Sequence, residues 1–179
     1  MYEEKAYARL IFVGVPGSGK TAVGEYIAQH TGVTFIDVDT RVGQVLHMPI
    51  HDLIITGDER LHEVRQSVAL DAISTQGVIV ALGASQVHDP AIVESIDRAQ
   101  RAGTDIVQLS VDISTLTVRE GMNVPRPVSL GAPRAMLAQM MSAHQSACER
   151  IGAIRVDTNK KSITQVAFDV MNTCKMLDG

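Results

Sequence analysis

Short apolar runs alternate with longer amphipathic stretches along this chain. Runs that fit a buried strand lie at residues 9–13, 33–36, 77–82, 106–111 and 153–156. Helical patterns lie at residues 20–30, 58–75, 90–102, 133–150 and 161–176. Because the strand runs are apolar at successive positions, we expect both faces of the sheet to be covered. The pattern therefore predicts a three-layer α/β fold, with a five-stranded parallel sheet flanked by helices.

Length and composition narrow the class of protein. At 179 residues the chain has the length of one domain, so we expect a single unit over residues 1–179. It has no Trp, three Tyr, three Phe and a formal net charge of −4. Both features disfavour a nucleic-acid partner, because such proteins present positive charge to phosphates and, for single strands, aromatic rings to bases.

Membrane and secretory signals are absent from the pattern. No apolar stretch approaches the roughly 18 residues that a membrane-spanning helix needs. The acidic start at residues 1–5 does not have the basic, then apolar, character of a secretory signal. Cys148 and Cys174 have no metal-ligand spacing around them and are expected to be buried or idle thiols. We therefore expect a cytoplasmic protein without a membrane partner.

A glycine-rich turn follows the first predicted strand. Its residues, Gly14-Val15-Pro16-Gly17-Ser18-Gly19-Lys20-Thr21, fit the phosphate-binding pattern G-x-x-x-x-G-K-[ST]. The backbone N–H groups from Gly14 to Gly19, Ser18 included, would surround nucleotide phosphates, at which the positive end of the next helix also points. Lys20 would contact the terminal phosphates, and the Thr21 hydroxyl would ligate Mg²⁺.

The phosphate loop alone does not separate a kinase from a GTPase or an ATPase. A GTPase would carry N-K-x-D to read guanine, but Asn159-Lys160-Lys161-Ser162 lacks the Asp. A motor-type ATPase would have a strand ending in Asp-Glu, whereas the third predicted strand ends in Leu82-Gly83-Ala84-Ser85. The remaining class is a kinase that acts on small molecules.

Further motifs follow the loop in a fixed order. They are Phe35-Ile36-Asp37-Val38-Asp39, Gly57-Asp58-Glu59, Leu82-Gly83, Arg126-Pro127-Val128 and Arg155-Val156-Asp157-Thr158-Asn159. In this order and with these gaps, the chain resembles the shikimate kinase family over nearly its whole length. The resemblance implies a P-loop kinase fold with a mobile lid, approximately residues 113–133. It also implies transfer of the γ-phosphate of ATP, with Mg²⁺ as cofactor, to a ring hydroxyl of shikimate.

The resemblance implies roles for residues on the nucleotide side. Asp37 would support the Mg²⁺ ion through water, and Asp39 would hold the substrate hydroxyls and help take the proton of the attacking one. Arg126 would reach from the lid to the transferring phosphate, and Arg119 would lie near the nucleotide. Lys20, Asp39 and Arg126 are the expected catalytic residues. Plainer interpretations remain, in which Asp39 caps a helix and both arginines are solvated loop charges.

The acceptor side departs from the family's pattern. His62 and His144 stand where the family has two arginines that grip the shikimate carboxylate, and Arg65 stands where it has a glutamate. Gly83-Ala84-Ser85 replaces a Gly-Gly-Gly turn that approaches the substrate. Histidine does not reproduce the permanent charge and bidentate fork of arginine, so we expect weaker shikimate binding. These positions remain the candidates for substrate binding, and Arg65 could restore one contact.

The sequence leaves several functions open. The first is a kinase for a hydroxyl of shikimate, or of a related polyol or ring acid. The second is an ATP-binding relative that has lost shikimate phosphorylation and is non-catalytic or regulatory. A nucleoside monophosphate kinase would need several arginines around the acceptor phosphate, and Arg60, Arg65, Arg134 and Arg150 are only loosely placed for it. The Gly, Pro and Asn content of residues 119–133 predicts an irregular, mobile lid loop.

Overall fold

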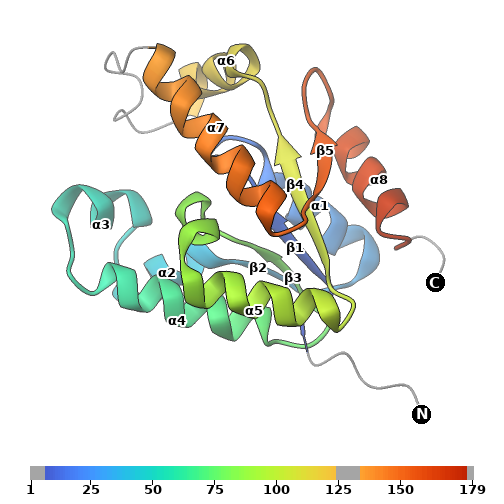
Figure 1. Ribbon diagram of the computed structural model, residues 1–179, viewed down its shortest axis with the longest axis horizontal. Helices are drawn as coiled ribbons and strands as arrows, with labels where there is room; N and C mark the ends of the chain where they lie inside the picture. The colour runs from blue at the N-terminus through green and yellow to red at the C-terminus, as the bar shows by residue number, and fades with distance from the viewer. Residues whose placement is uncertain (1–6, 124–133, 177–179) are drawn as a thin grey trace.

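Five parallel strands form the central sheet (Figure 1). In the computed structural model, which describes residues 7–123 and 134–176, they are β1 (Leu10–Val13), β2 (Phe35–Asp37), β3 (Ile79–Ala81), β4 (Asp105–Ser110) and β5 (Ile154–Asp157). Their order across the sheet is β2-β3-β1-β4-β5. In β1, Ile11 is paired with Val80 of β3 on one side and Ile106 of β4 on the other. The carboxyl ends of β1, β3 and β2 are therefore neighbours.

Helices cover both faces of this sheet. They are α1 (Lys20–Thr31), α2 (Val38–Leu46), α3 (Ile50–Thr56), α4 (Leu61–Ile73), α5 (Pro90–Arg101), α6 (Ile113–Asn123), α7 (Arg134–Arg150) and α8 (Ile163–Thr173), with a short 3-10 helix, η1 (Ala84–His88). The pair α1 and α8 packs on one face, and α2, α4 and α5 pack on the other (Figure 1). No helix among the described residues is long and apolar enough to span a membrane.

The central strand β1 divides the hydrophobic core in two. Leu10 and Phe12 pack with residues of α1 and α8, whereas Ile11 and Val13 pack with residues of α2, α4, α5 and α7. All four side chains are at most 1% exposed. Alternate residues of a strand point to opposite faces, so an unbroken apolar run is what a strand between two helical layers requires.

The predicted three-layer α/β fold is confirmed. Each of the five strand runs and five helical stretches named from the sequence overlaps an observed element, with boundaries that agree to within three residues. The sequence did not delimit α2, α3 or α6. The apolar pattern is weakest at the edges of the sheet, where Val156 is the only buried residue of β5. An edge strand has a neighbour on one side only, so its side chains are less fully covered.

The predicted irregular lid is wrong at its start. Arg119 and the residues up to Asn123 belong to α6, whose first turn is capped by Asp112. The carboxylate of Asp112 accepts a hydrogen bond from the backbone N–H of Thr115, at 2.6 Å, and this contact favours a helix over an irregular loop. Residues 124–133, with Arg126, lie outside the described residues. The single-domain boundary and the lid over 113–133 stay predictions.

One glycine of α1 allows the helix to approach β2 closely. A Cβ atom at Gly24 would overlap the ring of Phe35. We expect Gly24→Ala to lower the free energy of unfolding by about 1–3 kcal/mol, despite the better helix propensity of alanine, because the ring must shift in a packed core. Urea unfolding measures this. Glu25→Ala, at the exposed neighbouring position, should be neutral or slightly stabilising; an equal loss in both variants would contradict the prediction.

Candidate active site

The phosphate loop turns the chain from the end of β1 into α1. Its backbone is left-handed at Gly17, with φ 77°, and at Gly19, with φ 101°, a conformation that side chains rarely adopt. Gly14 has no room for a side chain, since a Cβ atom there would lie 2.6 Å from the hydroxyl of Ser18. Because α1 begins at Lys20, the positive end of its dipole faces the loop. The loop therefore has the geometry of an anion site.

Ser18 lies inside this loop and is 1% exposed. Its backbone N–H donates to the carbonyl of Val15 at 3.2 Å and closes the turn. Its side-chain hydroxyl is buried and has no hydrogen-bond partner among the described residues. An unpaired buried hydroxyl costs free energy, so this group fits a loop whose polar contacts a phosphate completes.

Lys20 bends back over the loop. Its ammonium donates to the backbone carbonyls of Gly14, at 2.8 Å, and Val15, at 3.1 Å. Burial lowers the pKa of Lys20 to about 8, although the nearby carboxylates of Asp39 and Asp37 act to raise it. A bound anion would favour the charged form further, so Lys20 is suited to hold a phosphate.

Asp37 performs two local tasks at the end of β2. One carboxylate oxygen accepts from the backbone N–H of Thr40, at 2.9 Å, and so caps α2. The other accepts from the hydroxyl of Thr21, the second residue of α1, at 2.6 Å. The sequence left open that Asp39 caps this helix, but the residue that caps α2 is Asp37. A hydroxyl and a carboxylate side by side are hard oxygen ligands, so this pair fits Mg²⁺.

Asp39 and Arg65 meet against the bare backbone of Gly83. Nη2 of Arg65, on α4, donates to Oδ1 of Asp39, in the first turn of α2, at 3.0 Å. A Cβ atom at Gly83 would lie 2.5 Å from that nitrogen and 2.8 Å from that oxygen. The absence of a side chain at Gly83 is therefore a condition for this ion pair. Nε of Arg65 is buried without a partner among the described residues.

Nucleotide and acceptor residues border one open space. Lys20, Thr21, Asp37 and Asp39 all line a cavity of about 680 Å³ beside α2, which Gly83 also borders. The ends of β1, β2 and β3 supply these residues directly or through the segments that follow them. Parallel sheets bind ligands beyond the carboxyl ends of their strands, which is where this cavity lies.

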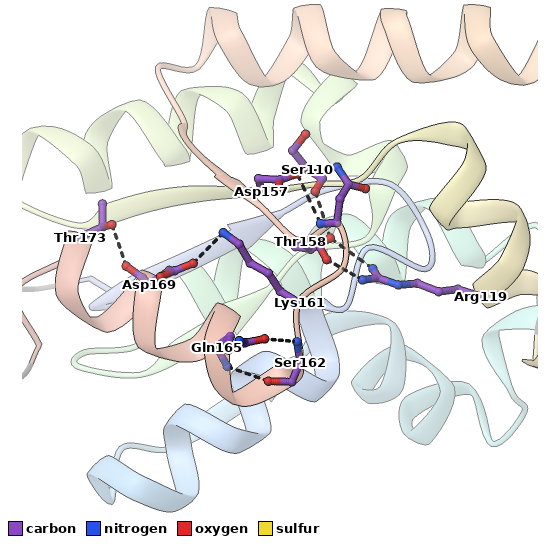
Figure 2. Close-up of polar contacts among 10 residues, drawn as sticks. Ser110, Arg119, Asp157, Thr158, Lys161, Ser162, Gln165, Asp169 and Thr173 are labelled. Carbon is purple, nitrogen blue, oxygen red and sulfur yellow. Dashed lines mark hydrogen bonds and ion pairs between the residues drawn. The ribbon is translucent and has the colours of Figure 1, made fainter.

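Arg119 connects α6 to the phosphate loop and to the turn after β5. Its guanidinium donates to the carbonyl of Thr158 at 2.8 Å and to the hydroxyl of Thr158 at 3.2 Å (Figure 2). It also donates to the carbonyl of Gly17 at 3.4 Å. Thr158 in turn donates through both its N–H and its hydroxyl to the carbonyl of Ser110. The sequence left open that Arg119 is a solvated charge on a loop. In the structure it is half-buried and lies on a helix.

Comparisons with known proteins now identify the family. The shikimate kinase family model matches residues 16–175. The shikimate kinase of Mycobacterium avium is 31% identical over 156 residues, which cover 86% of each chain. That of Thermobifida fusca is 28% identical over 158 residues, which cover 88% of this chain and 89% of its own. This chain belongs to the shikimate kinase family. It is an ATP-dependent kinase of small molecules.

Solved shikimate kinases share the fold. The enzyme from Acinetobacter baumannii, solved in complex with shikimate, superposes with a TM-score of 0.82 at 18% identity, over 97% of this chain and 95% of its own. The enzyme from Aquifex aeolicus gives a TM-score of 0.74 at 15% identity, over 93% and 96%. The architecture is therefore kept while most side chains differ.

The two histidines at the family's arginine positions lie on different helices. His144, on α7, is 5% exposed, and its Nε2 lies 3.4 Å from Sγ of Cys148. His62, on α4, is exposed and borders the same cavity as Arg65. Neither histidine is hydrogen-bonded to Asp39 in the described part of the chain. Of the three side chains expected around Asp39, the structure brings Arg65 into contact with it.

Sequence reasoning missed His88, which ends η1. Its ring meets the ring of His144 edge-on, with the centroids 6.2 Å apart. His88 borders two cavities, one with His62 and one with His144 and Ala84. Its place in the segment that follows Gly83 and Ala84 was a signal, because those two residues were already expected to border the substrate. Cys148 is a free, buried thiol, as expected, and its Sγ contacts the candidate site residue His144.

His144 makes stability depend on pH. Burial, the charge of Lys20 and the neighbouring His88 lower the pKa of His144 to about 4, against the opposing effect of a hydrogen bond to the backbone of Ala84. The unfolded chain binds a proton at this residue below its ordinary pKa, about 6.5, whereas the folded chain does not until about pH 4. Stability should therefore fall as the pH is lowered through this window.

This effect can be measured by urea unfolding at about pH 7 and about pH 5. Over this interval, His144→Asn should lose about 2 kcal/mol less stability than the unaltered protein, because the variant no longer has the titrating group. His30→Asn, at an exposed position of α1, should lose as much as the unaltered protein. The same pH dependence in all three proteins would contradict the pKa shift of His144.

Arg119 should contribute to nucleotide affinity. Removing its guanidinium in Arg119→Ala frees the turn at Thr158 and the loop carbonyl of Gly17, so we expect the Kd for ATP to rise about tenfold. Isothermal titration calorimetry measures this value. Arg98→Ala is the matched control, because Arg98 forms a solvent-exposed i,i+4 pair with Glu94 on α5. An unchanged Kd in Arg119→Ala would show that these contacts do not support the nucleotide site.

Proposed function

We propose that this protein transfers the γ-phosphate of ATP to a hydroxyl of shikimate or of a related small polyhydroxylated metabolite. The observation that carries this proposal is the cavity that Lys20 and Thr21 share with Asp39. A phosphate donor held at the first two residues and an acceptor held at the third would face each other. We place the reaction in the cytoplasm.

The nucleotide side supplies positive charge. Lys20 would hold the terminal phosphates, and the Thr21–Asp37 pair, joined at 2.6 Å, would hold Mg²⁺ directly or through water. Bound Mg²⁺ neutralises phosphate charge, which is a large part of what proteins contribute to phosphoryl transfer. Arg119 keeps the phosphate loop and the turn after β5 together at this side. Arg126, outside the described residues, is proposed to reach the transferring phosphate.

The acceptor side supplies a base. Asp39 would accept a hydrogen bond from the attacking hydroxyl and take its proton as the bond to phosphorus forms. Its ion pair with Arg65, at 3.0 Å, fixes the carboxylate at the rim of the cavity and leaves its second oxygen for the acceptor. Positioning of this kind removes much of the entropic cost of bringing two reactants together.

A panel of hydroxylated metabolites, supplied with ATP and Mg²⁺, tests this function. ADP release by a coupled assay, with the phosphorylated product confirmed by mass spectrometry, is expected with at least one acceptor. Asp39→Asn should lower kcat at least about 100-fold, because a general base contributes on this scale. Asp71→Asn, on the exposed side of α4, should keep full activity.

The non-catalytic alternative predicts a different result. Tight ATP binding without product from any acceptor, unchanged by Asp39→Asn, would contradict the proposed kinase activity. It would favour the nucleotide-responsive relative considered from the sequence.

A further inference from the structure

Gln86 is a buried polar side chain that contacts both Gly83 and Arg65. It lies in η1, three positions after Gly83, and is 3% exposed. Its Oε1 accepts a hydrogen bond from the backbone N–H of Gly83 at 2.6 Å, and its Nε2 donates to the backbone carbonyl of Arg65 at 3.0 Å. One amide therefore links the turn after β3 to α4.

The chemistry of this link requires an amide. The N–H of Gly83 needs an acceptor and the carbonyl of Arg65 needs a donor, so each end of the Gln86 side chain can face one partner only. A carboxylate would supply the acceptor without the donor. Because the contact with Gly83 is buried, loss of the amide would also leave a backbone N–H without its partner, which costs free energy.

The Gly83 end of the link lies against the ion pair of Asp39 and Arg65. A Cβ atom at Gly83 would lie 2.5 Å from Nη2 of Arg65, and 2.8 Å and 3.0 Å from the two carboxylate oxygens of Asp39. The backbone of the turn and the ion pair are thus packed without room for a further atom. A displacement of this turn would therefore disturb the ion pair.

The Arg65 end of the link fixes the point from which the guanidinium reaches Asp39. Nη2 of Arg65 donates to Oδ1 of Asp39 at 3.0 Å, whereas Nε is buried and has no hydrogen-bond partner among the described residues. The arginine is therefore held by hydrogen bonds at its tip and at its backbone. Because a long side chain has many rotamers, the position of its backbone decides whether the tip meets Asp39 in one orientation.

We propose that Gln86 is a positioning residue for the kinase reaction. It holds the Gly83 turn and α4 together, and it thereby keeps Arg65 in the place from which this arginine orients the carboxylate of Asp39. The inference rests on the proposed function, because it concerns the base of the same reaction. Orientation of a reacting group acts on the rate of the chemical step, so the effect belongs to kcat.

A local role as a helix cap is the alternative. In a capping box, a Gln at the third position of a helix accepts from the N–H of the residue before the helix, and Gln86 stands in this relation to Gly83. Such a cap needs the contact of Oε1 alone. The bond to Arg65, 21 positions away in the chain, has no part in it. The two roles therefore differ in what they predict for Gln86→Glu, which keeps an acceptor and loses the donor.

Kinetics of two variants separate these roles. With ATP, Mg²⁺ and the acceptor of the panel that gives the highest rate, Gln86→Glu and the uncharged Gln86→Met should each lower kcat at least about tenfold. The Kd for ATP, measured by isothermal titration calorimetry, should change less than about twofold, since neither contact of Gln86 involves the phosphate loop. Full kcat in Gln86→Glu would overturn the inference and leave Gln86 as a helix cap.

Thr104→Val is the matched control for loss of a buried hydrogen bond. The Thr104 hydroxyl donates to the carbonyl of Ala8 at 2.6 Å, at the amino ends of β4 and β1, away from the phosphate loop. This variant should keep its kcat, and thermal unfolding verifies that every variant is folded. An equal loss of kcat in Thr104→Val and Gln86→Met would show a general effect of destabilisation and refute the positioning role.

Coupling to Arg65 tests the route of the effect. If Gln86 acts through this arginine, Gln86→Met should lower kcat by less than about twofold in an Arg65→Met background, where there is no guanidinium to position. The same loss in both backgrounds would contradict the inference while the kinase function still stands. No product from any acceptor with the unaltered protein would remove the proposed function and this inference with it.

Discussion

β1 is the element on which the site depends. This strand is buried on both faces and pairs with β3 and β4, so the position and direction of its carboxyl end are fixed. The phosphate loop starts there, and the neighbouring ends of β3 and β2 place Gly83 and Asp37 beside it. The packing of the apolar run from Leu10 to Val13 thus sets the distance between nucleotide and acceptor groups. Polar residues of the site are held in place by a core that contains none of them.

The contact of Asp39, Arg65 and Gly83 joins this edge of the sheet to α4. The contact requires three features at once. They are the carboxylate of Asp39 in the first turn of α2, the long cationic side chain of Arg65 on α4, and the absence of a side chain at Gly83, just after β3. An ion pair with partial solvent contact contributes little to stability by itself. Its value lies in orientation, since a base whose counterion is fixed keeps one oxygen in place for the acceptor. The pairing uses one N–H group of Arg65 and leaves its buried Nε without a partner among the described residues.

Local sequence patterns were sufficient for the sheet, for the major helices and for the phosphate loop, because each depends on residues close together in the chain. The double role of Asp37 was not predictable in this way, since it required knowing that α2 begins at the next residue and that Thr21 lies opposite. The pairing of Arg65 with Asp39 spans 26 positions and depends on backbone approach at Gly83. His88 was missed because comparison with a family pattern examines only the positions that the pattern contains. Arg119 was assigned to a loop because the glycine and prolines after it outweighed the cap at Asp112.

The residues proposed for phosphoryl transfer and the positions expected to bind the rest of the acceptor lie on different parts of the fold. Lys20, Thr21, Asp37 and Asp39 line one cavity, and in the proposed function loss of any of them would affect phosphoryl transfer itself. The positions expected to bind the rest of the acceptor, His62, Ala84 and His144, lie on α4, η1 and α7, outside the sheet. The reaction class thus follows from the sheet edge, and the identity of the acceptor follows from the helices around it.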